Sequence, residues 1–320
     1  MSAPVAATPD TIERAASILR EGGVVAIPTE TVYGLAANAL DARAAARIFE
    51  IKRRPSFDPL IVHVSSVAML EALVDGVPEA AEALIERFWP GPLTLVFEKS
   101  AVVPGIVTAG ASTVAVRMPA HPVARAIIEL AGIPLAAPSA NLFGSISPTR
   151  ASHVASGLGD AVDMIVDGGP SEHGLESTIV TLSPVPTILR PGAISMEEIV
   201  RVLGPVAVGS TPSDGAMVPG ALPYHYAPAT PLRLIASKAV PLSERASAGW
   251  IGLGDEPEGY AIAKTLSRTA DLREAAASLF DTLHELDERS LERIDAEPIP
   301  ERGIGVAIAD RLRRAAASKR

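Results

Sequence analysis

The sequence predicts an α/β protein: a mixed sheet with flanking helices, followed by a smaller C-terminal α/β domain. Strand-like and helix-like segments alternate along most of the chain. Three strand-like segments between Met164 and Arg190 have no helix between them, so the sheet need not be all parallel. The stretch from Gly204 to Pro231 is rich in Pro and Gly and is interpreted as a connector. The predicted domains are therefore residues 8–205 and 232–320, with residues 206–231 between them.

Helix signals are clear in the first domain. Asp10-Thr-Ile-Glu13 is an N-cap pattern with an acid three residues on, and Gly22-Gly23 stops the helix after Arg20. Apolar periodicity and capping residues predict further helices at residues 41–51, 79–88, 122–131 and 195–203. Short apolar runs predict strands at Val24–Ile27, Leu60–Val64, Leu93–Phe97, Val114–Arg117, Pro134–Ala137, Met164–Val166, Thr178–Leu182 and Thr187–Arg190.

The second domain is predicted from the same two patterns. Ala270–Arg293 and Asp310–Ala317 are helix-like. Strands are predicted at Leu232–Ile235, Trp250–Gly252, Tyr260–Leu266 and Gly305–Ile308. No helix is expected in the connector, because its prolines remove backbone donors and favour extended backbone.

Composition limits the possible functions. At 320 residues, with 48% hydrophobic and 20% charged side chains, the chain can bury a globular core. Because it contains no Cys, it cannot form disulfides, thiolate nucleophiles, iron–sulfur sites or sulfur-ligated zinc sites. A net charge of −9 disfavours nonspecific binding to nucleic acid. The sequence has no signal-peptide pattern and no apolar run of roughly 18 residues, so we expect a cytoplasmic protein without a membrane partner.

Several common catalytic motifs are missing. The sequence contains no P-loop, no Gly-x-Gly-x-x-Gly turn, no Gly-x-Ser-x-Gly and no His-Glu-x-x-His. Polar residues instead follow several predicted strands, which is where α/β folds usually place their sites. The first such segment, Pro28–Gly34, brings two hydroxyls, a carboxylate and a phenol to one loop. A turn held by Thr side chains explains this segment equally well.

The second segment is Lys52-Arg53-Arg54-Pro55. Cations in a last helical turn followed by Pro are typical of a helix end. The alternative is phosphate binding, because a Lys and an Arg one residue apart can straddle a polyphosphate without a glycine loop. His63, at the end of the next predicted strand, is either a satisfied structural histidine or part of the same site.

Three further groups follow later strands. Arg117 ends an apolar strand and needs an acid, water or an anionic ligand. Ser139-Ala-Asn141 follows the next strand, and for Ser147 and Thr149 a helix N-cap is the favoured interpretation. The glycines after Asp167 favour a turn, but would also let backbone amides approach an anion.

Taken together and in this order, these segments resemble the YrdC-type threonylcarbamoyl-AMP synthases, in the long form with an extra C-terminal domain. The resemblance covers essentially the whole chain, with residues 8–205 as the catalytic domain. Pro28–Gly34 is similar to the opening loop of the family. The other matching segments are Lys52-x-Arg54 and Ser139-x-Asn141, the paired signature motifs, and the interdomain segment from Pro219-Gly220 to His225-Tyr226-Ala227-Pro228.

The resemblance implies a fold, a reaction and a site. The fold is a twisted mixed sheet, and the reaction converts L-threonine, bicarbonate and ATP into threonylcarbamoyl-AMP and pyrophosphate. By similarity, the ATP contacts are Lys52, Arg54, Asp58, Thr113, Ser139, Ser147, Arg190 and Tyr226, the last reaching back from the connector. The threonine contacts are Thr31, His63, Arg117, Ala137 and Ser177, and the residues closest to the chemistry are Lys52, Arg54, Ser139 and Asn141.

Partners follow from the same resemblance. The activated carbamoyl group later goes to an adenosine beside the tRNA anticodon, so downstream transfer proteins and tRNA are indirect partners. We expect Mg²⁺ to be bound through the ATP phosphates, with no metal site built by the protein, because Mg²⁺ usually keeps waters and borrows substrate oxygens. The alternatives are a non-catalytic RNA-binding module and a nucleotide-binding paralogue without activity. Hydrogenase-maturation chemistry fits poorly, because proteins of that class carry zinc-finger cysteines and additional domains.

Overall fold

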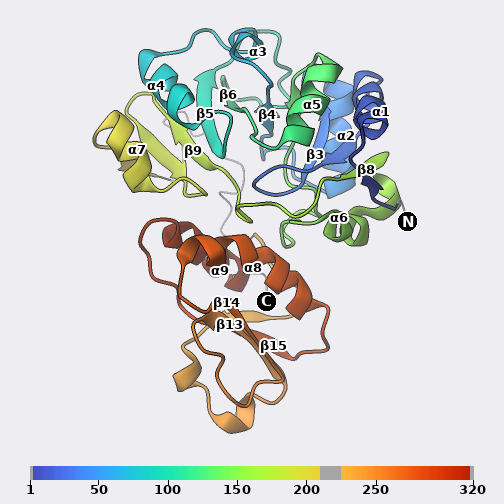
Figure 1. Ribbon diagram of the computed structural model, residues 1–320. Coiled ribbons are helices and arrows are strands. Elements are labelled where there is room, and N and C mark those ends of the chain that lie inside the picture. The colour runs from blue at the N-terminus through green and yellow to red at the C-terminus, as the bar shows by residue number, and fades with distance from the viewer. Residues whose placement is uncertain (1–2, 210–224, 318–320) are drawn as a thin grey trace.

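The structure, a computed structural model, describes residues 3–209 and 225–317. Within these residues the chain forms two sheets (Figure 1). The strands of the larger sheet are β1 (Val5–Ala6), β2 (Val25–Ile27), β3 (Gly34–Asn38), β4 (Ile61–His63), β5 (Leu93–Glu98), β6 (Thr113–Arg117), β7 (Leu135–Ala136), β8 (Met164–Asp167), β9 (Thr178–Thr181), β10 (Thr187–Arg190) and β11 (Ala207–Val208). They lie in the order β1-β8-β2-β3-β7-β4-β6-β5-β9-β10-β11.

The larger sheet is mixed, as predicted. Parallel pairs such as β4 with β6 and β5 with β9 alternate with antiparallel pairs such as β5 with β6 and β9 with β10. Its helices are α1 (Pro9–Arg20), α2 (Ala42–Lys52), α3 (Val67–Glu71), α4 (Glu79–Phe88), α5 (Pro122–Ala131), α6 (Ala151–Leu158) and α7 (Met196–Leu203). The capping box of α7 is confirmed, because Ser195 Oγ accepts from Glu198 N and the Glu198 side chain accepts from Ser195 N. The N-cap of α1 is Thr8, two residues before the predicted Asp10.

The two faces of this sheet are packed differently. Side chains alternate across a strand, so Val25 and Ile27 face one side and Val24 and Ala26 the other. The side of Val25 packs against α1 and α5, and the opposite side packs against α2, α4, α6 and α7. Further along the first side, over β4, β9 and β10, the described residues provide only a small cluster of Ile61, Ile179 and Leu189. Because few apolar side chains cover that part of the sheet, a pocket can lie over it.

The smaller sheet is parallel, with strand order β12-β15-β13-β14. Its elements are β12 (Leu232–Leu234), β13 (Ala248–Leu253), β14 (Ile262–Ser267), β15 (Arg293–Ala296), α8 (Leu272–Asp287) and α9 (Gly305–Ala316). The described residues also include three 3₁₀ turns, η1 (Gly159–Ala161), η2 (Ser237–Ala239) and η3 (Leu242–Glu244). Figure 1 shows α8 and α9 on the side of this sheet that faces the larger part of the molecule.

Some predicted elements are wrong. Gly305–Ile308, predicted as a strand, is the first turn of α9, and the strand of that region is β15. A short apolar run does not distinguish a strand from a buried helix, and here Ile304, Ile308 and Leu312 recur at helical spacing on the buried side. The helix predicted to Arg293 ends at Asp287. The strand β3 and the short helix α3 were not predicted.

The two parts of the chain are in direct contact. Val32, Ile146 and Leu175 from the larger part belong to the same buried cluster as Phe280 of α8. Arg150 forms a two-pronged ion pair with Asp281 of α8, with N–O distances of 2.5 and 3.1 Å. None of the helices in the described ranges 3–209 and 225–317 has both the length and the apolar composition to span a bilayer.

Candidate functional site

A pocket lies over the part of the larger sheet that helices leave uncovered. Ile61 and His63 of β4 and Arg117 at the end of β6 contribute side chains from the sheet itself. The remaining lining comes from the β2–β3 loop, from Arg54, from residues 137–139 and 176–177, from Arg190 and from two connector residues, His225 and Tyr226. Strand ends and the loops after them therefore surround one cavity, as the sequence predicts.

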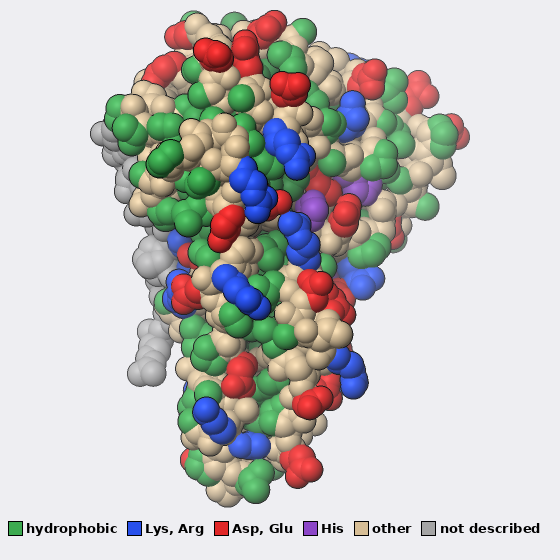
Figure 2. Space-filling view, turned by 60° about the vertical axis from the view of Figure 1, so that its left-hand side comes forward, with side chains coloured by type: hydrophobic (Ala, Val, Ile, Leu, Met, Phe, Trp, Pro, Cys, Tyr) green, Lys and Arg blue, Asp and Glu red, His purple; other side chains and the backbone are tan. Residues whose placement is uncertain are grey.

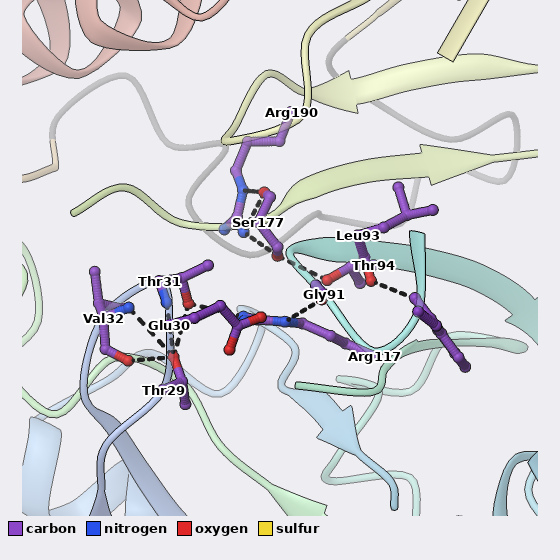
Figure 3. A network of polar contacts seen from close by, with 11 residues as sticks. Thr29, Glu30, Thr31, Val32, Gly91, Leu93, Thr94, Arg117, Ser177 and Arg190 are labelled. Carbon is purple, nitrogen blue, oxygen red and sulfur yellow. Dashed lines mark hydrogen bonds and ion pairs between the residues drawn. The ribbon is translucent and has the colours of Figure 1, made fainter. Parts of the chain in front are cut away.

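The β2–β3 loop is held by its own hydroxyls. Thr29 Oγ1 accepts from the backbone amides of Thr31 and Val32 and donates to the Val32 carbonyl at 2.6 Å (Figure 3). Tyr33 is fully buried, and its hydroxyl donates to the Gly169 carbonyl. The turn held by Thr side chains is therefore confirmed, and Thr29 and Thr31 also line the pocket, so the functional interpretation stays a prediction.

Arg117 is paired with a carboxylate that the sequence analysis did not assign to it. Its guanidinium donates to Glu30 Oε1 at 2.5 Å, to Thr31 Oγ1 at 2.8 Å and to the Gly91 carbonyl at 3.1 Å (Figure 3). Burial pushes the pKa of Glu30 upward, but the charge of Arg117 and its hydrogen bond hold the net pKa below the usual value. Arg117 is therefore fixed in one orientation while it still lines the pocket.

His63 lies next to Arg117 on the neighbouring strand and is buried. Burial, together with the nearby positive charge of Arg117, lowers the pKa of His63 to about 3. The imidazole is therefore neutral at physiological pH. His63 Nδ1 lies 3.3 Å from the Ile61 carbonyl oxygen, to which it donates, so the neutral ring offers Nε2 to a ligand as a hydrogen-bond acceptor rather than a charge.

Lys52 and Arg54 both point into the protein, although they are only one residue apart. The residue between them, Arg53, adopts a left-handed conformation with φ 52° and is exposed. Arg54 lines the pocket and pairs with Asp58 at 3.0 Å. Lys52 Nζ donates to the carbonyls of Ser139 and Asn141, at 2.5 and 2.6 Å. Lys52 therefore does not line the pocket, but its two hydrogen bonds hold the Ser139–Asn141 loop in position.

A further cation lies at the end of β10. Arg190 donates to the Ser177 carbonyl at 2.9 Å and to Ser177 Oγ at 3.0 Å, and Ser177 Oγ lies 2.7 Å from Thr94 Oγ1 (Figure 3). Burial lowers the pKa of Arg190 to about 10, so the guanidinium keeps its charge at neutral pH. Arg54, Arg117 and Arg190 thus place positive charge on three sides of the cavity.

The two connector residues His225 and Tyr226 line the cavity. Tyr226 is 1% exposed, adopts a positive φ of 65°, and stacks on Phe280 of α8 with ring centroids 5.5 Å apart. His225 packs edge-on against Phe143. The predicted extended backbone of residues 210–224, including the Pro219-Gly220 part of the family segment, lies outside the described residues.

The predicted site residues are largely brought together. All five predicted threonine contacts line the pocket: Thr31, His63, Arg117, Ala137 and Ser177. Of the predicted ATP contacts, Arg54, Ser139, Arg190 and Tyr226 line it, while Lys52, Asp58 and Ser147 lie buried behind residues that do. Asn141 packs behind the lining as well, under Lys52. Thr113 is at the other end of β6 from Arg117 and lines a separate hollow with Ser112 and Ser183.

The helix-cap interpretation of Ser147 is wrong. The N-cap of α6 is Arg150, without a side-chain hydrogen bond, and Ser147 Oγ instead donates to Glu176 at 2.5 Å. Thr149 does not cap α6 either, and its hydroxyl lies 3.5 Å from His153 Nδ1. Glu176 lines the pocket but was not among the predicted site residues, and neither was His225. The available signal was their position, beside Ser177 and Tyr226.

Comparisons with known proteins agree with this arrangement. A family model described as telomere recombination matches residues 17–192, and one described as threonylcarbamoyl-AMP synthase, C-terminal domain, matches residues 194–317. The chain is 45% identical to the threonylcarbamoyl-AMP synthase of Pyrococcus abyssi, covering 95% of this chain and 93% of that protein. It is 44% identical to the threonylcarbamoyl-AMP synthase of Bacillus subtilis, covering 96% and 93%. The crystal structure of P. abyssi Sua5 complexed with L-threonine superposes with a TM-score of 0.89 at 42% identity, covering 98% of this chain and 96% of that one.

Proposed function

Because the chain belongs to the threonylcarbamoyl-AMP synthase family, we propose that it joins L-threonine, bicarbonate or the CO₂ derived from it, and ATP into threonylcarbamoyl-AMP and pyrophosphate. The observation that carries the proposal is that one cavity combines the five predicted threonine residues with Arg54, Ser139 and Arg190. An amino acid and a triphosphate would therefore lie side by side, which the reaction requires.

The amino-acid half of the cavity suits a zwitterion. Arg117 offers its guanidinium to the threonine carboxylate, already oriented by Glu30 and Gly91. Neutral His63 adds hydrogen bonding without a second positive charge that would repel the threonine ammonium. The threonine amine must lose a proton and add to CO₂, which forms a carbamate. Such a carbamate loses CO₂ readily, so the cavity has to keep it in place until it reacts.

The second step is a displacement at phosphorus. A carbamate oxygen attacks the α-phosphorus of ATP, a P–O bond forms, and the P–O bond to the pyrophosphate breaks. Negative charge builds up on the leaving pyrophosphate, and the guanidinium groups of Arg54 and Arg190 are placed to offset it. No covalent protein intermediate is needed, so the protein contributes mainly orientation and charge neutralisation.

Lys52 has a supporting part in this proposal. For Lys52 Nζ to reach a phosphate, it would have to leave two carbonyls that it contacts at 2.5 and 2.6 Å. Its contacts with Ser139 and Asn141 instead set the position of the loop whose Ser139 lines the cavity. We therefore propose that Arg54 contacts the nucleotide directly, whereas Lys52, Asp58 and Asn141 support the residues that contact it.

Mg²⁺ is proposed to enter with the nucleotide. Within the described parts of the chain, no group of three or more His, Asp or Glu side chains is arranged to hold a metal ion. Mg²⁺ usually keeps several waters and binds substrate phosphate oxygens, so a protein-built cage is not required. When bound in this way, the ion would neutralise phosphate charge alongside Arg54 and Arg190.

Transfer of the product to tRNA, through downstream proteins in the cytoplasm, belongs to the same proposal. The RNA-binding alternative is not favoured, because the net charge is −9 and the relatives of the chain are synthases. On the face in Figure 2, Lys and Arg side chains are interspersed with Asp and Glu rather than gathered into one basic surface.

The test is pyrophosphate release from ATP, measured with threonine and bicarbonate each omitted in turn. We expect release only when both are present, together with a threonylcarbamoyl-adenylate detected by mass spectrometry. Release that is independent of threonine would indicate an ordinary ATP hydrolase. Folded protein that yields no pyrophosphate in the complete mixture would contradict the proposal.

A further inference from the structure

A buried arginine of the smaller part of the chain contacts two residues that line the pocket, although it does not line the pocket itself. Arg311, on α9, is 1% exposed. Its guanidinium donates to Glu176 Oε2 at 2.8 Å, to the Pro191 carbonyl at 3.0 Å and to Asp310 Oδ2 at 2.6 Å. Its central carbon also lies 5.0 Å from the ring centroid of Tyr226. One side chain therefore contacts the loop before β9, the segment after β10 and the connector.

Two of these partners line the pocket. They are Tyr226 and Glu176. Among the described residues that line the pocket, Glu176 is the only one with a carboxylate. Its other oxygen, Oε1, accepts from Ser147 at 2.5 Å. Burial pushes the pKa of Glu176 upward, but Arg311, Arg190 and the hydrogen bond from Ser147 bring it below the usual value, so the side chain is ionised. A negative charge thus lines a cavity that the proposed function fills with a triphosphate.

We propose that Arg311 is a positioning residue for the pocket: it neutralises Glu176 and fixes Glu176 and Tyr226 in one arrangement, so that the smaller domain, through Arg311, strengthens binding of a polyanion in the cavity. The inference rests on the proposed function and deepens it. It assigns to the smaller domain a defined electrostatic task at a site otherwise built mainly by the larger part and the connector.

The arrangement explains why an arginine is used here. A planar guanidinium can bind the carboxylate, the Pro191 carbonyl and the Tyr226 ring at the same time, whereas an ammonium group acts as a point charge. Without this cation, Arg190 would be the remaining positive charge close to Glu176, and the carboxylate would face the incoming phosphates with less compensation. Two like charges in a cavity of low dielectric repel each other strongly.

The experiment compares four variants of the full chain: Arg311→Met, Arg311→Gln, Glu176→Gln and the double variant Arg311→Met/Glu176→Gln. The dissociation constant of a non-hydrolysable ATP analogue is measured by calorimetry, and KM for ATP, KM for threonine and kcat are measured by pyrophosphate release. The matched control is Arg150→Met, which removes an exposed arginine from the same junction between the two parts.

If Arg311 acts by neutralising Glu176, the dissociation constant of the analogue should change in opposite directions in Arg311→Met and Glu176→Gln. Arg311→Met should weaken binding of the analogue at least tenfold, Glu176→Gln should tighten it severalfold, and the double variant should return to within about threefold of wild type. KM for threonine, which carries no net charge, should change less than KM for ATP. Arg150→Met should stay within about twofold of wild type in all four measurements.

A purely structural role gives a different pattern. In that case Arg311→Met and Glu176→Gln would both weaken binding, and the double variant would be no better than either single variant, which would overturn the proposal. If Arg311→Met does not fold, Arg311→Gln and its combination with Glu176→Gln give the same comparison, and Glu176→Gln alone still tests the sign. Wild-type protein that binds the analogue without threonine-dependent pyrophosphate release would contradict the proposed function and leave this inference standing.

Discussion

Neighbouring cations in the sequence have different proposed tasks, although loss of either Arg54 or Lys52 should be costly. Arg54→Ala should lower kcat/KM by about two orders of magnitude, because it removes the proposed charge partner of the leaving pyrophosphate. Lys52→Ala should lower it by a similar factor through displacement of the Ser139–Asn141 loop. Steady-state kinetics with pyrophosphate release measure both. Arg53→Ala is the matched control, because Arg53 is exposed and its change should leave kcat/KM near wild type. Wild-type kinetics in Arg54→Ala would remove that residue from the mechanism.

Single residues at strand ends could be predicted from the sequence, and their partners could not. His63 and Arg117 were singled out because polar residues at the ends of buried strands gather at one edge of a sheet, whereas Ser177, which precedes β9, was predicted from the family resemblance. The ion pair of Arg117 with Glu30 joins positions 87 residues apart, and that of Arg311 with Glu176 joins positions 135 apart. Such pairs depend on how strands are ordered in space, which local pattern does not contain.

Between elements, the contact of α6 with α8 makes stability depend on pH. The rings of His153 and His284 stack with centroids 3.9 Å apart, beside Arg150 and Asp281. Burial and the neighbouring His284 lower the pKa of His153 to about 4, against about 6.5 in an unfolded chain. The unfolded state therefore binds more protons between these values, so the contribution is present above about pH 6.5 and is lost as the pH falls toward 4.

Replacing His153 by Gln should reduce this loss. Urea denaturation at several pH values between 4 and 7.5 measures the free energy of unfolding of both proteins. The slope between about pH 4 and 6.5 should be smaller in the variant, while the other buried histidines, including His63, contribute equally to both. Parallel curves for the two proteins would show that the stacked pair has no part in the pH dependence.

Whole elements were predicted well where period and caps agreed. The helix that begins at the capping box of Ser195 is an example, and the helix over residues 79–88 was predicted although no side chain caps it. The strand β3 was missed because Gly34–Asn38 consists largely of small residues, and its strand pairing with β2 and β7 comes from the hairpin rather than from β propensity. The strand β15 was missed because its four residues include Arg293 and Asp295, whose charges pair with each other.

At the scale of the molecule, the junction of the two parts depends on one glycine. Gly174 has φ 64°, and a Cβ built there would lie 2.5 Å from the Ala277 carbonyl oxygen and 2.6 Å from that of Ala276, both on α8. Only a residue without a side chain allows so close an approach. Because Leu175 and Glu176 follow directly, pushing α8 away at this point should also disturb the pocket and the contact of Glu176 with Arg311.

Gly174→Ala should therefore lower both stability and nucleotide affinity, and Gly169→Ala is its matched control. Gly169 has φ 86°, so Ala is strained there as well, but a Cβ at Gly169 meets nothing within 4 Å. The control should lose about 1–2 kcal/mol of unfolding free energy from backbone strain alone. Gly174→Ala should lose more, and it should also raise KM for ATP, because the steric clash acts on the loop that carries Glu176. Equal effects of the two variants on unfolding and on KM would show that the close contact between the loop and α8 does not shape the pocket.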